Sequence, residues 1–235
     1  MSKTQSAHQP WHKSYKKSLE VKPHWSQHGM PTLFDEFVQM VKKQEGFHLD
    51  IGCGNGVKTV NFALQGLDTI GVDIAKDGLK EANKLIKKLD LNSKCRVVQA
   101  DCLRLPKDLP KIKSVSDFLC YTHLKEAEQS LYKANLIKLL PVGGYGLFVL
   151  FSASDKHFHG HSINKRYDFQ FDPNNPLMEG YQHYQDMHNV HFNEEDILRD
   201  FAKFRVVKLI EVQHPMDNHR RLWEVIVANN KSSNE

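Results

Sequence analysis

The segment Asp50-Ile51-Gly52-Cys53-Gly54-Asn55-Gly56 constrains the fold of this 235-residue chain more than any other segment. The apolar residues before it predict a buried strand, and residues 57–67 predict a helix after it. The three glycines permit positive φ angles and a close approach of the backbone by another group. The helix that follows directs its first N–H groups and its positive dipole end at this loop. The segment therefore predicts a cradle for a nucleoside-type ligand, with a simple strand-to-helix turn as the alternative.

The glycine spacing separates this loop from two other phosphate-binding loops. A dinucleotide fingerprint requires its third glycine at the position of Val57, and no G-K-[ST] of a P-loop follows. The pattern instead resembles motif I of the class I S-adenosylmethionine-dependent methyltransferases, an acidic residue, one further residue and G-x-G-x-G. Asp50 then either orients the loop or binds a ligand ammonium or water. The resemblance implies that the cofactor is held by Asp50, Gly52, Cys53, Gly54, Asn55 and Gly56.

The next acidic residue stands where the resemblance requires one. Residues 69–72 predict a short buried strand, which ends at Asp73 with Ile74 next in the chain. In the family this acidic position binds both ribose hydroxyls, and a carboxylate suits a cis-diol because it accepts two hydrogen bonds. We therefore assign Asp73 and Ile74 to the cofactor site. The alternative is that Asp73 is the N-cap of a helix that starts near Lys76.

A third strand is predicted over residues 95–100, followed by Asp101 and Cys102. These two residues match the family positions that contact the adenine, the first through its carboxylate and the second through its backbone N–H. Asp101 alternatively caps a turn before residues 103–106. The resemblance rests on the order and spacing of these motifs over about 100 residues.

The remaining pattern predicts the rest of a Rossmann-like sheet. Strands alternate with helices up to residue 151, which implies a doubly wound, mostly parallel sheet with helices on both faces. Two final strands form an antiparallel hairpin in the family, the last inserting beside strand five, so we expect seven strands. The remaining predicted strands are 116–121, 145–151, 205–212 and 222–228, and the predicted helices include 31–43, about 125–140 and 194–201, the last with Asn193 as its N-cap.

The domain organisation predicted is a covering segment over residues 1–30 and one methyltransferase domain over residues 31–235. Residues 152–192 have no clear period and many aromatic and histidine residues, which favours a packed lid over the site. The N-terminal aromatics Trp11, Tyr15 and Trp25 loosely resemble the segment that covers the cofactor in the tellurite-resistance and thiopurine methyltransferase branch. The long insert departs from compact members of that branch.

His123 is the candidate catalytic residue, because an imidazole with a pKa near 6.5 can act as a general base. It follows the predicted fourth strand, whose end carries Tyr121, which we expect to pack over the methyl donor. The substrate pocket is then bordered by Tyr15, Trp25 and His123. The alternative reading of His123 is an ordinary residue at the start of a helix.

Composition limits the remaining possibilities. The 14 histidines include the alternating His157, His159 and His161, but no carboxylate or cysteine stands at a recognisable ligand spacing, so we expect no metal. The four cysteines form no CxxC pair and predict reduced thiols in a cytoplasmic protein. The N-terminus lacks an apolar signal-peptide region, and no apolar run is long enough for a membrane span.

The resemblance therefore implies a methyltransferase that transfers a methyl group from S-adenosylmethionine by in-line displacement, and the predicted aromatic lid on a single domain favours a small-molecule acceptor. The net charge of +4 and the lysines before residue 45 leave an RNA or protein methyltransferase as one alternative. Nucleic acid is thus a possible partner but not the favoured one. A non-catalytic module that binds S-adenosylmethionine is the other alternative. We expect a monomer or a homodimer.

Overall fold

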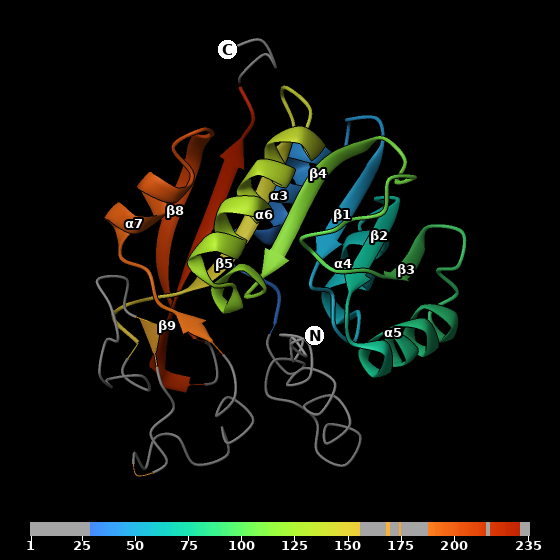
Figure 1. The fold of residues 1–235 in the computed structure, drawn as a ribbon. Coiled ribbons are helices and arrows are strands. Elements are labelled where there is room, and N and C mark those ends of the chain that lie inside the picture. Colours follow the sequence, from blue (N-terminus) through green and yellow to red (C-terminus); the bar gives the residue numbers. More distant parts are fainter. Residues whose placement is uncertain (1–28, 156–167, 170–173, 175–187, 215–216, 231–235) are drawn as a thin grey trace, which may run out of the picture.

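The computed structural model describes residues 29–155, 168–169, 174, 188–214 and 217–230. A seven-stranded sheet in the order β3-β2-β1-β4-β5-β9-β8 forms its centre (Figure 1). The first five strands run parallel, and β9 lies antiparallel between β5 and β8. The predicted fold class is therefore confirmed. The strands are β1 (Phe47–Ile51), β2 (Thr69–Asp73), β3 (Cys95–Gln99), β4 (Ile112–Phe118), β5 (Tyr145–Phe151), β8 (Arg205–His214) and β9 (Asp217–Ala228).

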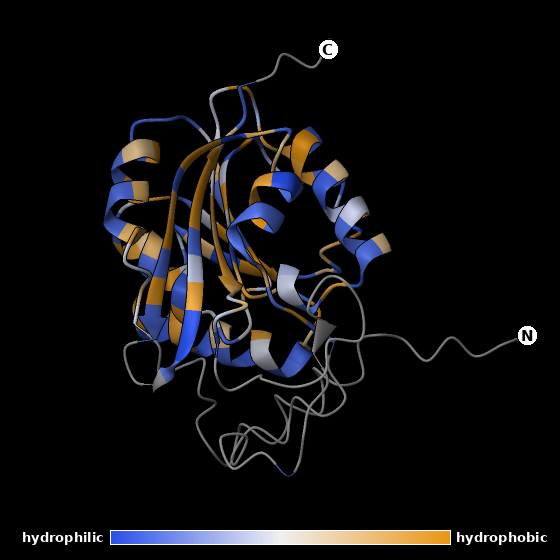
Figure 2. Ribbon diagram, turned by 90° about the vertical axis from the view of Figure 1, so that its left-hand side faces the viewer, coloured by the Kyte–Doolittle hydropathy of each residue, from blue (hydrophilic) through white to orange (hydrophobic). Residues whose placement is uncertain are grey.

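Helices cover both faces of this sheet. One apolar cluster joins α3 (Phe34–Val41) and α4 (Val57–Leu64) to one face, and α5 (Lys76–Lys88) packs beside α4. The largest cluster joins α6 (Glu126–Leu139) and α7 (Glu194–Asp200) to the other face. Figure 1 shows α6 in front of the sheet with α3 and α4 behind it. Figure 2 shows the hydrophobic colour concentrated along the strands and the hydrophilic colour on the outer sides of the helices.

The start of α7 follows the sequence prediction. The Asn193 side chain accepts a hydrogen bond from the Asp196 N–H (2.8 Å), and the Asp196 carboxylate accepts one from the Asn193 N–H (3.4 Å). This capping box satisfies two N–H groups that the first turn of a helix leaves without a helical partner. It also places Phe192 and Phe201, which flank the helix, in the main core.

Strand β4 differs from its prediction, because it begins at Ile112 and ends at Phe118 rather than spanning 116–121. The early residues are polar but buried, since Lys113 donates to the Gln44 carbonyl (2.9 Å) and Ser114 contacts the His48 ring (2.9 Å). At the other end, the Asp117 carboxylate accepts the N–H groups of Cys120 and Tyr121 and turns the chain into the 3₁₀ helix η1 (Tyr121–His123). The prediction that Tyr121 ends a strand is therefore wrong.

Parts of the predicted cover and lid lie outside the described residues. These include Tyr15 and Trp25, Trp11, five aromatics of the insert (Phe158, Tyr167, Phe171, Tyr181 and Tyr184) and the histidines His157, His159, His161 and His183. Within the insert the structure describes β6 (Asp168–Phe169), which pairs antiparallel with β7 (Asn189–Val190). In the described part of the chain, no helix combines the length and apolar character needed to cross a membrane.

Candidate cofactor and acceptor site

The glycine loop after β1 requires glycine for two reasons. Gly52 and Gly56 have φ angles of 72° and 75°, which side chains with a Cβ rarely adopt. A Cβ on Gly52 would also lie 2.5 Å from the Cβ of Cys120, and one on Gly56 would lie 2.6 Å from the Cβ of Ala82. The loop therefore packs between η1 and α5, and it leads directly into α4 at Val57.

Asp73 ties the end of β2 to this loop. Its Oδ2 accepts a hydrogen bond from the Gly54 N–H (2.8 Å), and its Oδ1 accepts one from the Ala75 N–H (2.7 Å). The N-cap residue of α5 is Ala75, so Asp73 does not take the capping alternative. Each carboxylate oxygen has a second lone pair, so these bonds are compatible with a ligand diol at the same group. Ile74 follows at the same edge of the sheet.

Asp50 lies beneath the loop and is fully buried. Its two oxygens accept hydrogen bonds from Thr59 Oγ1 (2.6 Å) and Ser116 Oγ (2.7 Å). Because the Ser116 proton points at Asp50, the neighbouring His48 Nε2 donates to Ser116 Oγ (2.9 Å). Burial raises the pKa of Asp50 to about 6, and burial lowers the pKa of His48 to about 3. These contacts are those of a residue that orients the loop, and direct contact of Asp50 with a ligand stays a prediction.

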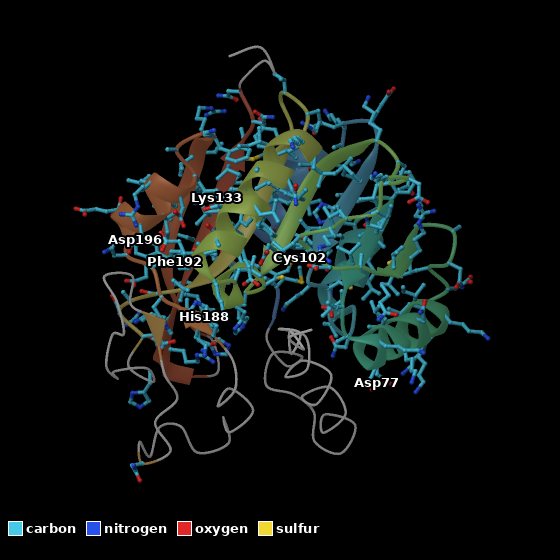
Figure 3. All side chains as sticks on the ribbon, in the orientation of Figure 1. Asp77, Cys102, Lys133, His188, Phe192 and Asp196 are labelled. Atoms are coloured by element: carbon cyan, nitrogen blue, oxygen red, sulfur yellow. The ribbon has the colours of Figure 1, made fainter. Side chains whose placement is uncertain are left out.

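The end of β3 carries Asp101 and Cys102. Asp101 Oδ1 accepts a hydrogen bond from the Leu103 N–H (2.8 Å), so the turn-capping contact considered from the sequence is present. A carboxylate has about four acceptor positions, and this contact is compatible with a second partner such as an adenine amino group. Figure 3 shows Cys102 near the ends of the parallel strands. Cys53, Cys95, Cys102 and Cys120 are all free thiols.

A cavity of about 130 Å³ opens beside the glycine loop. The loop and the start of α4 form one wall, with Lys58 among the lining residues, and the ends of β4, β5, β8 and β9 form the other. Lys58 Nζ donates to the Gly29 carbonyl, and burial lowers the pKa of Lys58 to about 8. Across the cavity, the Glu224 carboxylate accepts the N–H groups of Thr32 (2.9 Å) and Leu33 (2.8 Å) and thereby fixes the start of α3.

The candidate catalytic residue His123 lies beside Phe151 at the end of β5. His123 ends η1, and its Nδ1 lies 2.9 Å from the His188 carbonyl oxygen. A carbonyl only accepts, so Nδ1 carries a proton and Nε2 is the basic nitrogen of the neutral ring. Figure 3 shows His188 at the same end of the sheet as Cys102, toward β9. The described residues contain no group of three or more His, Cys, Asp or Glu side chains that could hold a metal ion.

The structure does not place the Tyr121 side chain at this cavity. The residue is fully buried, its ring packs against Tyr132, Phe192 and Phe201, and its hydroxyl donates to Asp200 (2.9 Å). The side chain therefore lies away from the cavity, where we had predicted that it packs over the methyl donor. The turn set by Asp117 explains the difference, because it directs the side chain toward α6 and α7.

The sequence reading missed three side chains of this region, which are Lys58, Glu224 and His214. The position of Lys58 could have been predicted from the sequence, since it directly follows the first residue of the helix after the glycine loop. Glu224 and His214 belong to the C-terminal hairpin, and only the insertion of β9 beside β5 brings them to the cavity. No local pattern in the sequence indicates that position.

The strand order, the glycine loop after β1 and the acidic residues at the ends of β2 and β3 define a class of protein. The part of the chain that carries these features is a class I S-adenosylmethionine-dependent methyltransferase domain, whose cofactor is S-adenosylmethionine. Residues 49–144 match a family described as "Methyltransferase domain". The particular branch of the class stays a prediction.

A solved structure illustrates the shared fold. The 1,6-didemethyltoxoflavin-N1-methyltransferase of Burkholderia thailandensis, solved with its substrate and S-adenosylhomocysteine, aligns with a TM-score of 0.69 and 15% identity. The alignment covers 98% of this chain and 93% of that chain. At this identity the likeness concerns the fold alone.

Two curated relatives from Caenorhabditis elegans match shorter segments. Sterol 4-C-methyltransferase strm-1 is 30% identical over 78 residues, which are 33% of this chain and 23% of that protein. The rRNA N(6)-adenosine-methyltransferase metl-5 is 32% identical over 80 residues, which are 32% of this chain and 37% of that protein. The matches thus span well under half of either relative.

Proposed function

We propose that this protein transfers a methyl group from S-adenosylmethionine to a small-molecule acceptor. The observation that carries the proposal is the Asp73 carboxylate bonded to the Gly54 N–H at the carboxyl ends of adjacent strands. Ligands of open α/β sheets bind at this edge. The structural neighbour from Burkholderia thailandensis was solved with bound 1,6-didemethyltoxoflavin, and a small acceptor here would be in line with that complex.

The residues present fit the cofactor. Asp73 would accept the ribose hydroxyls, with Ile74 beside it, while Asp101 and the Cys102 N–H would contact the adenine. The loop from Gly52 to Gly56 would hold the methionine end, where the cavity of about 130 Å³ has room for a group the size of benzene. When bound, the cofactor supplies a methyl group on a positively charged sulfur that is already a good leaving group. The protein then contributes orientation and exclusion of water.

His123 is the proposed general base for a protic acceptor. The His188 carbonyl holds the Nδ1 proton, so Nε2 can take a proton from an oxygen or nitrogen nucleophile. The His123 ring also stands edge-on to Phe151 (5.6 Å, 86°), which fixes its direction. A general base of this kind contributes about 10²–10⁴-fold to a rate.

Lys58 is the proposed partner of the cofactor carboxylate, because its ammonium lines the cavity and lies beside the loop. Replacing Lys58 by Met is expected to weaken S-adenosylmethionine binding about tenfold in calorimetry at pH 7, since a charged hydrogen bond is lost. Binding of 5′-methylthioadenosine, which lacks the carboxylate, should stay unchanged. Lys80→Met is the matched control, because Lys80 pairs with Asp77 on the exposed side of α5. If Lys58→Met weakens the binding of S-adenosylmethionine and of 5′-methylthioadenosine equally, this role of Lys58 is contradicted.

Calorimetry of the whole chain with S-adenosylmethionine, S-adenosylhomocysteine and NAD tests the proposed function. We expect binding of the first two and no binding of NAD, because Val57 stands at the position of the third fingerprint glycine. Failure of both S-adenosylmethionine and S-adenosylhomocysteine to bind would overturn the proposal. Cofactor binding without transfer to any acceptor would favour a non-catalytic module.

A second candidate is an RNA methyltransferase, favoured by one feature of the surface. Residues 76–111, which include α5 and the edge strand β3, contain ten Lys and Arg but only five Asp and Glu. The metl-5 relative acts on rRNA. RNA binding by this edge would weaken steeply as the salt concentration rises, because counterions are released on binding. A filter-binding assay at two salt concentrations separates this candidate from the first.

A further inference from the structure

Two cysteines contact each other at the carboxyl ends of β3 and β4. Cys102 lies just after β3, and Cys120 lies just after β4, where it is the N-cap residue of η1 (Figure 3). A hydrogen bond between the two thiols, together with burial, raises the pKa of Cys120 well above its usual value. Both residues are half-buried at the edge of the main core, and both are free thiols. The two thiols are therefore close together, unlinked and partly accessible.

Backbone and side-chain contacts fix this pair from both sides. In the sheet, β2 and β1 lie between β3 and β4, so the segment after β3 extends across their ends to bring Cys102 to Cys120. The Asn135 side chain of α6 holds that segment by donating to the Leu103 carbonyl (2.9 Å). The Asp117 carboxylate holds the other residue by accepting the Cys120 N–H (2.8 Å). The contact between the thiols thus spans two separate walls of the sheet edge.

The cysteine pair lies against the proposed cofactor site. A Cβ on Gly52 would lie 3.0 Å from Cys120 Sγ, so the glycine loop packs directly on this thiol. The charge of Asp73, the proposed ribose partner, adds to the hydrogen bond from Cys102 and to burial in raising the pKa of Cys120. The backbone N–H of Cys102 is the proposed adenine contact. A covalent link between the thiols would therefore change the shape of this site.

The other two cysteines are much less accessible. Cys53 and Cys95 are 8% and 4% exposed. Burial raises the pKa of Cys53 well above its usual value and that of Cys95 to about 12. A buried thiol that keeps its proton reacts poorly with oxidants, because the thiolate is the nucleophile. Cys53 and Cys95 thus serve as an internal comparison for the accessible pair.

We propose that Cys102 and Cys120 form a site of reversible oxidation by hydrogen peroxide, which closes a disulfide and weakens cofactor binding. Cys120 keeps its proton at neutral pH, so the Cys102 thiolate attacks the peroxide first. An S–O bond forms as the O–O bond breaks, and the released hydroxide takes up a proton to give water. The Cys120 sulfur then attacks the sulfur of the Cys102 sulfenic acid. The S–S bond forms as the S–O bond breaks, and the hydroxyl leaves with the Cys120 proton as a second water, so two electrons pass from the thiols to the peroxide.

The disulfide is expected to displace the adenine contact. Its sulfur atoms lie closer together than those of two hydrogen-bonded thiols, and its dihedral angle is restricted. Closing the bond therefore moves Cys102 toward η1, and its backbone N–H moves with it. By linkage, bound cofactor favours the reduced pair by the same factor. The effect on cofactor affinity rests on the proposed function, whereas formation of the disulfide does not.

The test treats the whole chain with hydrogen peroxide and then alkylates the remaining thiols with iodoacetamide. Mass spectrometry should show two alkylated cysteines instead of the four of the untreated chain, and peptide mapping should identify the Cys102–Cys120 link. In calorimetry, S-adenosylhomocysteine affinity should fall about tenfold, a usual size for coupling between two sites. Dithiothreitol should restore the affinity, and saturating S-adenosylhomocysteine should slow the oxidation.

Cysteine variants assign the response to this pair. Cys120→Ala removes one thiol but keeps the Cβ against the glycine loop, so peroxide should leave its S-adenosylhomocysteine affinity at the value of the untreated variant. Cys120→Ser serves if the alanine variant fails to fold. Cys95→Ala is the matched control, because it removes a buried thiol and should keep the full response to peroxide.

Three results would overturn the inference. They are four alkylated cysteines after peroxide, a link through Cys53 or Cys95, and a Cys102–Cys120 disulfide that leaves S-adenosylhomocysteine affinity unchanged. Each of them leaves the proposed function intact if the reduced chain binds S-adenosylhomocysteine. Failure of the reduced chain to bind this ligand concerns the proposed function instead, and the mapped disulfide still tests the oxidation site.

Discussion

Replacing Asp73 by Ala is expected to weaken S-adenosylmethionine binding by about 1.5–3 kcal/mol, or roughly tenfold to more than hundredfold. The variant loses the proposed acceptor for the ribose hydroxyls. It also leaves the N–H groups of Gly54 and Ala75 without their carboxylate partner, which loosens the loop. Calorimetric titration of the wild type and the variant with S-adenosylmethionine measures the effect directly.

Two comparisons separate ligand contact from loop support. Asp73→Asn keeps one oxygen for the loop but removes the charge, so we expect an intermediate loss of affinity. Asp77→Ala is the matched control, because Asp77 pairs with Lys80 on the outer surface of α5. An Asp73→Ala variant with wild-type affinity would rule out the ribose role. If Asp73→Ala loses the same affinity for adenosine as for 2′,3′-dideoxyadenosine, the effect would instead come from the loop.

The sequence predicted the parts of the fold that local chemistry determines. The glycine loop, Asp73 and Asp101 each stand at or just after the end of a short strand, and the β2 and β3 assignments match the structure within one or two residues. Asn193 predicted the start of α7 as its N-cap, and Asp196, three positions later, completes the capping box. Such signals are contained in a few neighbouring residues.

The missed features depend on contacts between distant residues. Lys113 and Ser114 lie outside the predicted strand, yet they belong to β4 and are buried because Gln44 and His48 supply hydrogen-bond partners from another segment. Glu224 reaches the Leu33 N–H across a separation of 191 residues, and Arg220 reaches Asp155 across 65. Sequence spacing contains no information on those pairs until the order of the strands is known. The acceptor side of the site is therefore the part that sequence reasoning predicts least.

The second large effect concerns Asp117, which lies fully buried at the end of β4. Its carboxylate accepts hydrogen bonds from the Tyr132 hydroxyl (2.7 Å) and from the N–H groups of Cys120 (2.8 Å) and Tyr121 (3.1 Å). Burial nevertheless raises the pKa of Asp117 from 3.8 to about 7. The folded protein therefore holds the Asp117 proton more tightly than the unfolded chain does.

This shift makes stability depend on pH with a definite sign. Below about pH 4, Asp117 is protonated in both the folded and the unfolded state, so its burial does not lower the free energy of unfolding through ionisation. Between pH 4 and pH 7 the unfolded chain ionises first, so the free energy of unfolding falls as the pH rises. Above pH 7, the Asp117 carboxylate is ionised in both states, and the free energy of unfolding is lowered by the full amount. At 1.36 kcal/mol for each pKa unit, the loss is about 4 kcal/mol as an upper value.

Replacing Asp117 by Asn is expected to remove this loss. The amide oxygen can still accept the N–H groups of Cys120 and Tyr121, and the amide nitrogen can donate to the Tyr132 hydroxyl. In urea unfolding, the variant should therefore gain several kcal/mol relative to wild type between pH 4 and pH 8. Asp50→Asn should show a smaller gain that ends near pH 6, since the pKa of Asp50 is raised by burial only to about 6.

Asp108→Asn provides the surface control for this series, because Asp108 is exposed. A pH-independent difference for Asp117→Asn would mean that the surrounding N–H and O–H groups keep the carboxylate ionised in the folded protein. In that case the pKa of Asp117 would be the same in the folded and unfolded states, and its titration would not change the free energy of unfolding.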